Sequence, residues 1–494
     1  MFKINNHLLK IILFINIVIY IFLLLYVSSV SLFFDADILY YIILNVIIIT
    51  VLFILRKEHN KFLKKQYLRI CYIFIIAYLI VYFQIYLEYL LGNFDFSHKR
   101  FWISENIIIK SSIISSLGLF SFYFGYILKK DIKKNRNLNM RRTITSLSSY
   151  KILSFLLLLI YLFTINPLYL FGGYGKFDMG STARYASILF ELSIIAILVQ
   201  NIINLNNNKI DFIKYFKSLG VYFYLLVIFY LTTVLISGDR GPIMYVSMGI
   251  ISSYVILTKI KFPLWKILLV LSAASIVISS LVSIRTNTDN SKSSIEVIYE
   301  SLINSESVHY GYSDLEDVNS FSKSTLELAT SIRVFHIAVN QISMGEDLYL
   351  GKFQLMQIIT VIPLGQKMLQ HFMELEDYEL TSAGYLTFVA GGIDGEFGSS
   401  CLSDIYLDFG SIGVIVFMIL FGYIIRFLEL SIYNNSSSNL IIIISFIILC
   451  QYAIYIPRST IMFNFRNIIW VYMIMKIIHF FSSFKKESYA NHKK

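Results

Sequence analysis

The sequence is poor in charge and in cysteine. Of its 494 residues, 15% are charged and 57% are hydrophobic, whereas soluble globular proteins carry about 25% charged residues. This composition excludes a soluble globular protein and predicts a polytopic membrane protein. The three cysteines, Cys71, Cys401 and Cys450, are scattered along the chain. Their spacing excludes a disulfide framework and a cysteine metal site.

Several catalytic signatures are also missing. The chain has no Walker motif, no GxGxxG and no HExxH, so nothing indicates nucleotide hydrolysis or a zinc site, and we expect no cofactor and no metal. It has no internal repeat. The net charge of +11 does not indicate a nucleic-acid partner, because the placement of the basic residues follows membrane topology.

Long apolar runs are what the chain does have. A membrane span needs about 20 mostly apolar residues. By that rule we predict an all-α fold with about twelve transmembrane helices, the first being too long for a cleavable signal peptide. Their approximate cores are 8–33, 38–55, 70–91, 107–128, 152–171, 186–203, 219–236, 242–257, 263–284, 405–425, 440–456 and 461–481.

The short loops predict the orientation. Positive charge marks cytoplasmic loops, and the basic stretches fall on one side of a twelve-span threading. They are 56–69, 129–142, 209–217, 259–266 and the tail 485–494. We therefore expect both termini in the cytoplasm and the longest loop on the extracytoplasmic side. Charges on this side are expected at loop ends, where long side chains snorkel to the interface.

One connection is far longer than the others. Residues 285–404 hold 17 Asp and Glu against 6 Lys and Arg, and unstructured connections of that length are uncommon. We predict a helical extracytoplasmic domain here, flanked by membrane regions at 1–284 and 405–494. A capping box at Ser324-Thr-Leu-Glu327 predicts a helix running to about Ile342, with Arg333, His336 and Asn340 on one face.

The rest of this loop carries two further patterns. Phe353 to Gln370 is apolar but too short to span, which is typical of a helix lying in the outer interface or packing beneath the loop domain. Gly384 to Ser400 holds five glycines around Asp394 and Glu396. That density favours a mobile lid or a close approach of backbone to ligand.

Arginines gather where the spans meet the outer boundary. A corner of Gly238, Asp239, Arg240 and Gly241, followed by Pro242, separates two apolar runs. Other guanidiniums expected at this depth are Arg184, Arg285 and Arg458. Planar, permanently charged guanidiniums match phosphate, so the pattern indicates a diphosphate site. Taken singly, each arginine also suits lipid headgroups or pairing with Asp239 or Glu191. Arg466, two turns deeper, is the one most typical of a structural role.

Several of these features together resemble a known family. They are Gly172-Gly-Tyr followed by Arg184, the Gly238-Asp-Arg-Gly-Pro242 corner, and a long outer loop closing with Leu402-Ser-Asp-Ile-Tyr-Leu-Asp-Phe-Gly-Ser-Ile-Gly-Val414. This set is similar to the oligosaccharide repeat unit polymerases, the O-antigen polymerase (Wzy-type) family. The family's paired Arg-x10-Gly motif is not matched, because Ile195 stands eleven residues after Arg184.

The resemblance implies a GT-C-like membrane glycosyltransferase of polysaccharide biosynthesis. It would join oligosaccharide units carried on undecaprenyl diphosphate, at the outer leaflet of the inner membrane, for O-antigen, capsule or exopolysaccharide. Membrane lipids and the chain-length regulator and flippase of the same pathway are the implied partners. The diphosphate-binding candidates are Arg184, Arg240, Arg285, Arg458 and Arg333.

A general base should take the acceptor proton. His336 is the first candidate, and Asp394, Glu396 and Asp239 are the alternatives. A packing role for His336 is equally compatible with its position. Two other functions also fit the sequence: an O-antigen ligase-like glycosyltransferase, and a polysaccharide flippase or transporter, which predicts charges near the midplane and internal repeats.

Overall fold

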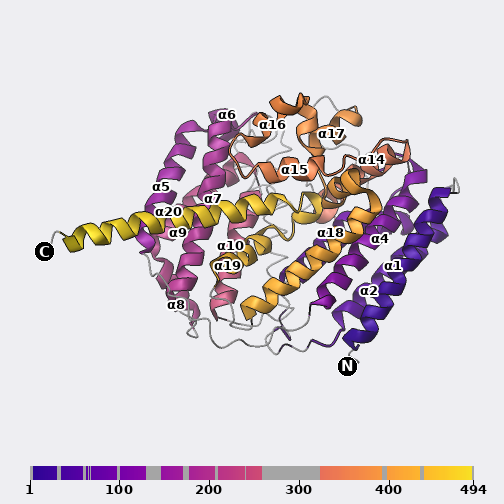
Figure 1. Cartoon of the computed structure of the whole chain (residues 1–494), viewed down its shortest axis with the longest axis horizontal. Helices are drawn as coiled ribbons and strands as arrows, with labels where there is room; N and C mark the ends of the chain where they lie inside the picture. Colours follow the sequence, from indigo (N-terminus) through magenta and orange to yellow (C-terminus); the bar gives the residue numbers. More distant parts are fainter. Residues whose placement is uncertain are drawn as a thin grey trace, which may run out of the picture.

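In hydrocarbon every backbone N–H and C=O must find its partner within the chain, which favours helices for apolar runs. The computed structural model is helical accordingly (Figure 1). It describes residues 4–491 except 30–34, 59, 61–62, 65, 67, 97–100, 130–145, 171–176, 206–209, 240, 259–322, 392–397 and 434–438. Within these residues, a single bridge between Ile4 and Arg56 is the only β pairing.

Two helical bundles lie side by side (Figure 1). The first contains α1 (Asn6–Ser29), α2 (Ala36–Ile54), α3 (Ile70–Leu90), α4 (Glu105–Leu128) and α18 (Cys401–Tyr433). The second contains α5 (Leu147–Thr164), α6 (Pro167–Leu170), α7 (Ser181–Leu205), α8 (Phe212–Leu219), α9 (Val221–Ser237), α10 (Gly241–Thr258), α19 (Leu440–Tyr452) and α20 (Phe463–Asn491). The short η3 (Ile456–Arg458) joins α19 to α20 and touches α3 and α18.

Eight of the described helices are long and apolar enough to cross a membrane: α1, α2, α3, α4, α5, α7, α10 and α18. The count is nine if α8 and α9, which meet at a bend of 80°, form one span. The chain is therefore a multi-pass membrane protein. The number twelve stays a prediction, because 263–284 lies outside the described residues, α19 is short, and α20 runs across the direction of α7 and α9 in Figure 1.

The predicted corner between two apolar runs is confirmed. Helix α9 ends at Ser237, and Gly238 follows with φ +84°, a left-handed conformation that glycine adopts without strain. Helix α10 begins at Gly241, whose N–H donates to Oδ1 of Asp239 at 3.0 Å. Asp239 thus caps the new helix.

The first bundle is held by close contact between α4 and α18. Almost every side chain of α4 is buried. A Cβ placed on Gly125 would meet the carbonyl oxygen of Ile419, and one on Gly422 would meet that of Phe122. Small residues at such crossings let backbones approach each other, so these two glycines fix where α18 crosses α4.

The described part of the long loop forms a cap at one end of the molecule, at the top of Figure 1. Its helices are α13 (Lys323–Ala329), α14 (Ile332–Ser343), α15 (Lys352–Ile359), α16 (Gly365–Met373), η2 (Asp377–Leu380) and α17 (Ser382–Val389). The predicted single helix from Ser324 to Ile342 is wrong in one respect, because Thr330 and Ser331 separate α13 from α14. We call this end the loop side.

Helix α18 attaches the cap to the membrane bundle. It bends at Gly410 (φ +62°), and the break leaves carbonyls exposed for other donors. The N–H groups of Tyr349 and Leu350 donate to the carbonyls of Leu407 and Asp408, at 3.0 Å each. The carboxylate of Asp408 also accepts from Phe353 N at 3.2 Å, at the start of α15.

A second carboxylate of α18 holds two more parts of the loop. Asp404 is fully buried and accepts from the hydroxyls of Ser382 and Ser399 and from Nε2 of Gln357, the last at 2.8 Å. Ser382 begins α17, and Gln357 lies on α15. Helix α18 therefore supplies two carboxylates that position the loop domain, beside the contacts that α3, α4 and α20 make with it.

Candidate functional site

Four of the residues predicted for the site lie outside the described residues. They are Arg240 of the corner, Arg285, and Asp394 and Glu396 of the glycine-rich stretch. Their proposed roles stay predictions, as does a convergence of all the named arginines on one site.

Arg184 lies on the first turns of α7 and faces outward. Its Nη2 pairs with Oδ1 of Asp178 at 2.8 Å, and both side chains are about two-thirds exposed (65% and 70%). An exposed pair of this kind is worth little energy and leaves the guanidinium accessible. The structure does not place Arg184 beside the other described candidates.

His336 is enclosed between α14, α3 and the segment before α4. It is 1% exposed. Its Nε2 lies 2.8 Å from the hydroxyl of Tyr86 and its Nδ1 lies 3.2 Å from the carbonyl oxygen of Phe101. Burial lowers the pKa of His336 to about 4 despite the bond to Phe101. This environment favours the packing role, and the catalytic role stays a prediction. Arg333, one turn earlier, is half-buried.

Asp239 and Arg458 lie in the same region of the loop side. The Arg458 guanidinium lies 6.0 Å from the ring centroid of Tyr455. The Tyr455 ring in turn packs against Tyr245 of α10 at 4.8 Å. Tyr245 is within electrostatic range of Asp239. The structure therefore brings these two predicted residues to one aromatic group.

A polar group that we call the loop-side cluster surrounds this aromatic contact. It consists of Glu191 (α7), Asp239, Tyr245 (α10), Tyr452 (α19) and Arg466 (α20). The rings of Tyr245 and Tyr452 lie 4.4 Å apart, and Tyr452 is within electrostatic range of both Glu191 and Arg466. Charged residues inside membrane helices are costly and are functional-site hypotheses by default. Four separate segments thus supply one candidate site.

Glu191 supplies the buried carboxylate of the cluster. It is 7% exposed, and its Oε1 accepts from the hydroxyl of Tyr230 at 2.7 Å. The Tyr230 oxygen also lies 2.8 Å from that of Ser187. Asp239 is near enough to influence Glu191 electrostatically. Two neighbouring carboxylates with different surroundings are a common basis for acid–base chemistry.

Arg466 supplies the cation of the cluster. It is 8% exposed, and its guanidinium carbon lies 4.0 Å from the Phe463 ring centroid and 5.2 Å from that of Trp470. Nε donates to Oδ1 of Asn467 at 3.3 Å. The indole of Trp470 donates to the carbonyl oxygen of Val361 at 2.8 Å, which ties this part of α20 to the loop domain.

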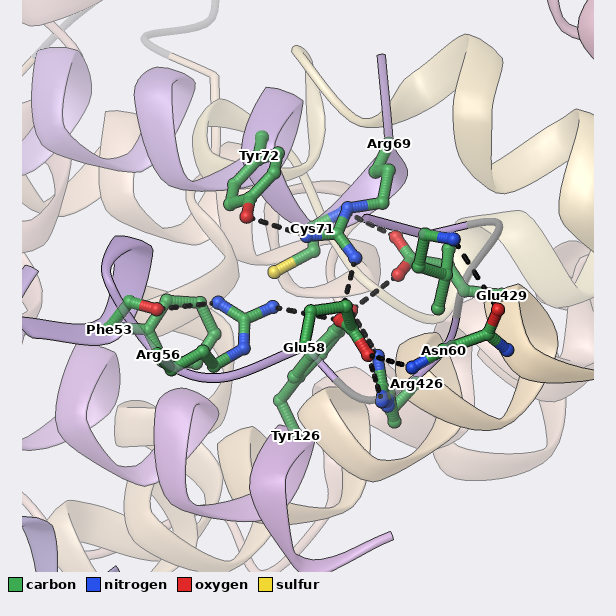
Figure 2. A network of polar contacts seen from close by, with 11 residues as sticks. Phe53, Arg56, Glu58, Asn60, Arg69, Cys71, Tyr72, Tyr126, Arg426 and Glu429 are labelled. Atoms are coloured by element: carbon green, nitrogen blue, oxygen red, sulfur yellow. Dashed lines mark hydrogen bonds and ion pairs between the residues drawn. The ribbon is translucent and has the colours of Figure 1, made fainter. Parts of the chain in front are cut away.

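A larger charge group lies at the other end of the first bundle. We call it the opposite-side network: Arg56, Glu58 and Arg69 between α2 and α3, with Arg426 and Glu429 of α18 (Figure 2). Glu58 pairs with all three guanidiniums, at 2.9 Å from Arg426, 3.0 Å from Arg69 and 4.0 Å from Arg56. Both carboxylate oxygens of Glu58 contact Arg426, the fork geometry that arginine provides.

Glu429 and tyrosines complete this network. Glu429 accepts from the hydroxyl of Tyr126 and from the backbone N–H of Cys71, the latter at 3.1 Å. Burial alone would raise the pKa of Glu58, but hydrogen bonding and charge from Arg426, with the charges of Arg69 and Arg56, lower it to about 2. The expectation that basic loop residues on this side snorkel is wrong for Arg56 and Arg69, because both are buried inside ion pairs.

Sequence reasoning missed the centre of the loop-side cluster. Arg466 stood out as a charge inside an apolar run but was interpreted as structural, and Glu191 was considered only as a partner for arginine. Tyr452 gave no signal among 36 tyrosines. In the part of the chain that is described, no group of three or more His, Cys, Asp and Glu is placed to hold a metal ion.

Comparisons with known proteins complete the description. No curated protein and no solved structure matches the chain. A family model described as O-antigen polysaccharide polymerase Wzy matches residues 11–488, nearly the full length, which confirms the resemblance stated from the sequence. The chain therefore belongs to the O-antigen polysaccharide polymerase Wzy family.

Proposed function

We propose that this protein joins oligosaccharide repeat units carried on undecaprenyl diphosphate, at the outer leaflet of the bacterial cytoplasmic membrane. The family match carries the proposal. The loop-side cluster supports it, because it offers a guanidinium, carboxylates and tyrosines at the end where the large loop covers the bundle.

The reaction needs no nucleotide. The acceptor hydroxyl oxygen attacks the anomeric carbon of the donor sugar, and the bond from that carbon to the diphosphate oxygen breaks. The electron pair leaves with the diphosphate, and the hydroxyl proton passes to a base. Donors aimed at the developing charge stabilise the transition state. Arg184, Arg240, Arg285, Arg333 and Arg458 are the proposed diphosphate ligands from the sequence.

The base is proposed from the carboxylates of the loop side. Asp239 lies at the corner, and Asp394 and Glu396 belong to the glycine-rich stretch of the long loop, outside the described residues. His336 remains in the set, but a catalytic role would require it to leave its bonds with Tyr86 and Phe101.

Deletion of the gene, followed by electrophoresis of the surface glycan, tests the proposal. Loss of the long ladder with a surviving one-unit band is the expected result. Accumulation of long lipid-linked glycan would instead indicate a ligase, and repeat units retained on the cytoplasmic side would indicate a flippase. An unchanged ladder would refute a polymerase.

Complementation of the deletion tests the corner. Arg240→Ala should fail to restore the ladder, and Arg240→Lys should restore it poorly because the planar fork is lost. Arg136→Ala, in the basic stretch predicted on the cytoplasmic side, is the matched control and should restore it fully. Equal restoration by Arg240→Ala and Arg136→Ala would remove the corner from the mechanism.

A further inference from the structure

Arg466 is a buried cation whose bonding is incomplete. Its Nη2 is buried and has no hydrogen-bond partner among the described residues, and no described carboxylate lies within 4.0 Å of the guanidinium. The aromatic rings of Phe463 and Trp470 cover it instead. Buried polar groups in native proteins nearly always have partners, so an unpaired one requires an explanation.

Other polar atoms nearby share this condition. Oδ1 of Asn464 on the same helix and Oε1 of Gln451 on α19 are also buried without a partner in the described chain. Helices α19 and α20 pack against each other. Gln451 is fixed through its other amide atom, since Nε2 donates to the carbonyl oxygen of Tyr245 at 2.8 Å. Helices α19 and α20, which pack against each other, therefore both carry buried polar atoms without a partner in the described chain.

We propose that Arg466 binds the phosphate oxygens of the lipid-linked donor. This inference rests on the proposed function. It adds a diphosphate-binding residue whose position in the sequence is most typical of a structural role. Stacking on Phe463 and Trp470 holds the plane of the guanidinium, while Nη2 stays available to an anion. Arginine is suited to this role because its planar donors match phosphate and it stays charged when buried.

A bulk lipid headgroup is a poorer ligand for this residue. Arg466 is 8% exposed, whereas an arginine that snorkels places its head in the wet interface. A diphosphate brought in by a polyprenyl chain enters between helices. There it meets aromatic surface from Phe463 and Trp470 and the charge of Arg466. The hydroxyl of Tyr452 and the carboxylate of Glu191 belong to the same cluster.

During transfer Arg466 stabilises the leaving group. When the bond from the anomeric carbon to the diphosphate oxygen breaks, its electron pair moves onto the diphosphate, and Arg466 is the buried positive charge of the cluster. The proton of the acceptor hydroxyl goes to a carboxylate base. Atoms and charge balance with no further reactant.

The test is ligand binding by the purified full chain in phosphatidylcholine nanodiscs. Undecaprenyl diphosphate is titrated and tryptophan fluorescence is followed, because Trp470 lies against Arg466. Binding should change the emission of the native protein, and Trp470→Phe should abolish that change. Arg466→Gln should weaken the affinity by about tenfold or more, the effect expected for a lost charge-assisted hydrogen bond. The affinity of Arg466→Lys should lie between that of Arg466→Gln and that of the native protein.

Lys476→Gln is the matched control. Lys476 lies on the same helix, with its Nζ 5.4 Å from the centroid of the Tyr472 ring. The substitution therefore also removes a cation that lies over an aromatic ring. Its affinity should equal that of the native protein. Gel filtration shows whether each variant is monodisperse, and if Arg466→Gln aggregates, the comparison is made with Arg466→Lys.

Two results would overturn the inference. One is equal affinity for undecaprenyl diphosphate in Arg466→Gln and the native protein. The other is an equal emission change from phosphatidylglycerol, which would make the ligand a bulk headgroup. Electrophoresis of the surface glycan distinguishes failure of the Arg466 inference from failure of the proposed polymerase function. Equal binding beside a ladder that depends on the gene refutes only the role of Arg466, whereas a ladder unchanged by gene deletion refutes the polymerase.

Discussion

The two charged groups of this protein differ in how their arginines are neutralised. In the opposite-side network Arg56, Arg69 and Arg426 share the carboxylate of Glu58, each within 4.0 Å. In the loop-side cluster Arg466 has aromatic neighbours and no described carboxylate at that distance. The arginines of both groups are buried.

The difference separates a structural group from a binding group. Nη2 of Arg56 and Nε of Arg69 also lack a hydrogen-bond partner in the described chain, but the charges of this network are neutralised by Glu58, and its role is to hold elements together. A buried charge without a counter-ion is destabilising until an anion arrives. The network therefore fixes α18 against the α2–α3 connection, and the cluster is the group that we propose to bind substrate. Four predictions test this contrast.

Removal of the Glu58 carboxylate should have the largest effect on the stability of the protein. Glu58→Gln leaves three buried guanidiniums without their shared carboxylate, and breaking such pairs costs about 3–5 kcal/mol of unfolding free energy. We expect a clear fall in the melting temperature measured in detergent. Glu105→Gln, at an exposed position on α4, is the control and should melt as the native protein does. A Glu58→Gln variant with native melting would show that the network stabilises nothing.

The second effect is pH-dependent and comes from His336. The pKa of the folded ring is about 4, against an ordinary 6.5, so the unfolded chain binds this proton more readily than the folded chain. Stability due to the neutral ring is complete above pH 6.5 and is lost as pH falls from 6.5 toward 4. The total is on the order of 3 kcal/mol.

Melting temperatures at pH 7 and pH 5 measure this term. His336→Asn should be less stable than the native protein at pH 7 and should lose less on acidification. His371→Asn, which changes an exposed histidine, should keep the native pH dependence. Identical slopes in all three proteins would contradict the buried, neutral state of His336.

Removal of the Arg466 charge should raise stability, whereas the first two changes lower it. Arg466→Leu removes a buried charge that lacks an ion pair, so the protein should become more stable by about 1–3 kcal/mol, while ladder formation is lost. Arg426→Leu, which leaves Glu58 with fewer partners, should lower stability. The melting temperatures of both variants, measured side by side, test this difference. If Arg466→Leu lowers the melting temperature as Arg426→Leu does, the contrast between the two groups is wrong.

The smallest effect is expected at Arg184. Its pair with Asp178 is exposed, and such pairs contribute less than about 1 kcal/mol. Arg184→Gln should therefore melt within error of the native protein. Any loss of glycan ladder by this variant would then report on substrate contact and not on folding, and a marked fall in melting temperature would contradict the exposed position.

Much of the fold follows from sequence because its signals are local. An apolar run specifies a helix by its own composition, and the corner at Gly238 is specified by two glycines and a proline within five residues. The break at Thr330 has no comparable signal, since neither glycine nor proline stands there. It separates two helices that pack on different neighbours, α13 on α3 and α14 mainly on α18 and α4.

The two charged groups could not be predicted because their contacts are distant along the chain. Glu58 meets Arg426 across 368 positions, and Cys71 meets Glu429 across 358. The sequence shows an excess of positive charge in 56–69. That net charge gives no sign that the one acid of the stretch, Glu58, pairs with three arginines. For Arg466 the visible feature was a cation in an apolar run. Its missing partner is visible only when the neighbouring helices are in place.

The bend of α18 at Gly410 has a consequence for how the outer domain can vary. Part of its attachment runs through main-chain atoms, from the N–H groups of Tyr349 and Leu350 to the carbonyls of Leu407 and Asp408. Backbone bonds of this kind ignore the identity of the side chains at 349 and 350 and depend on spacing. Leu350 is exposed, so other side chains should be tolerated there, whereas an insertion, a deletion or a proline at this seam would break these backbone bonds and leave Asp404, Asp408 and Trp470 to hold the cap.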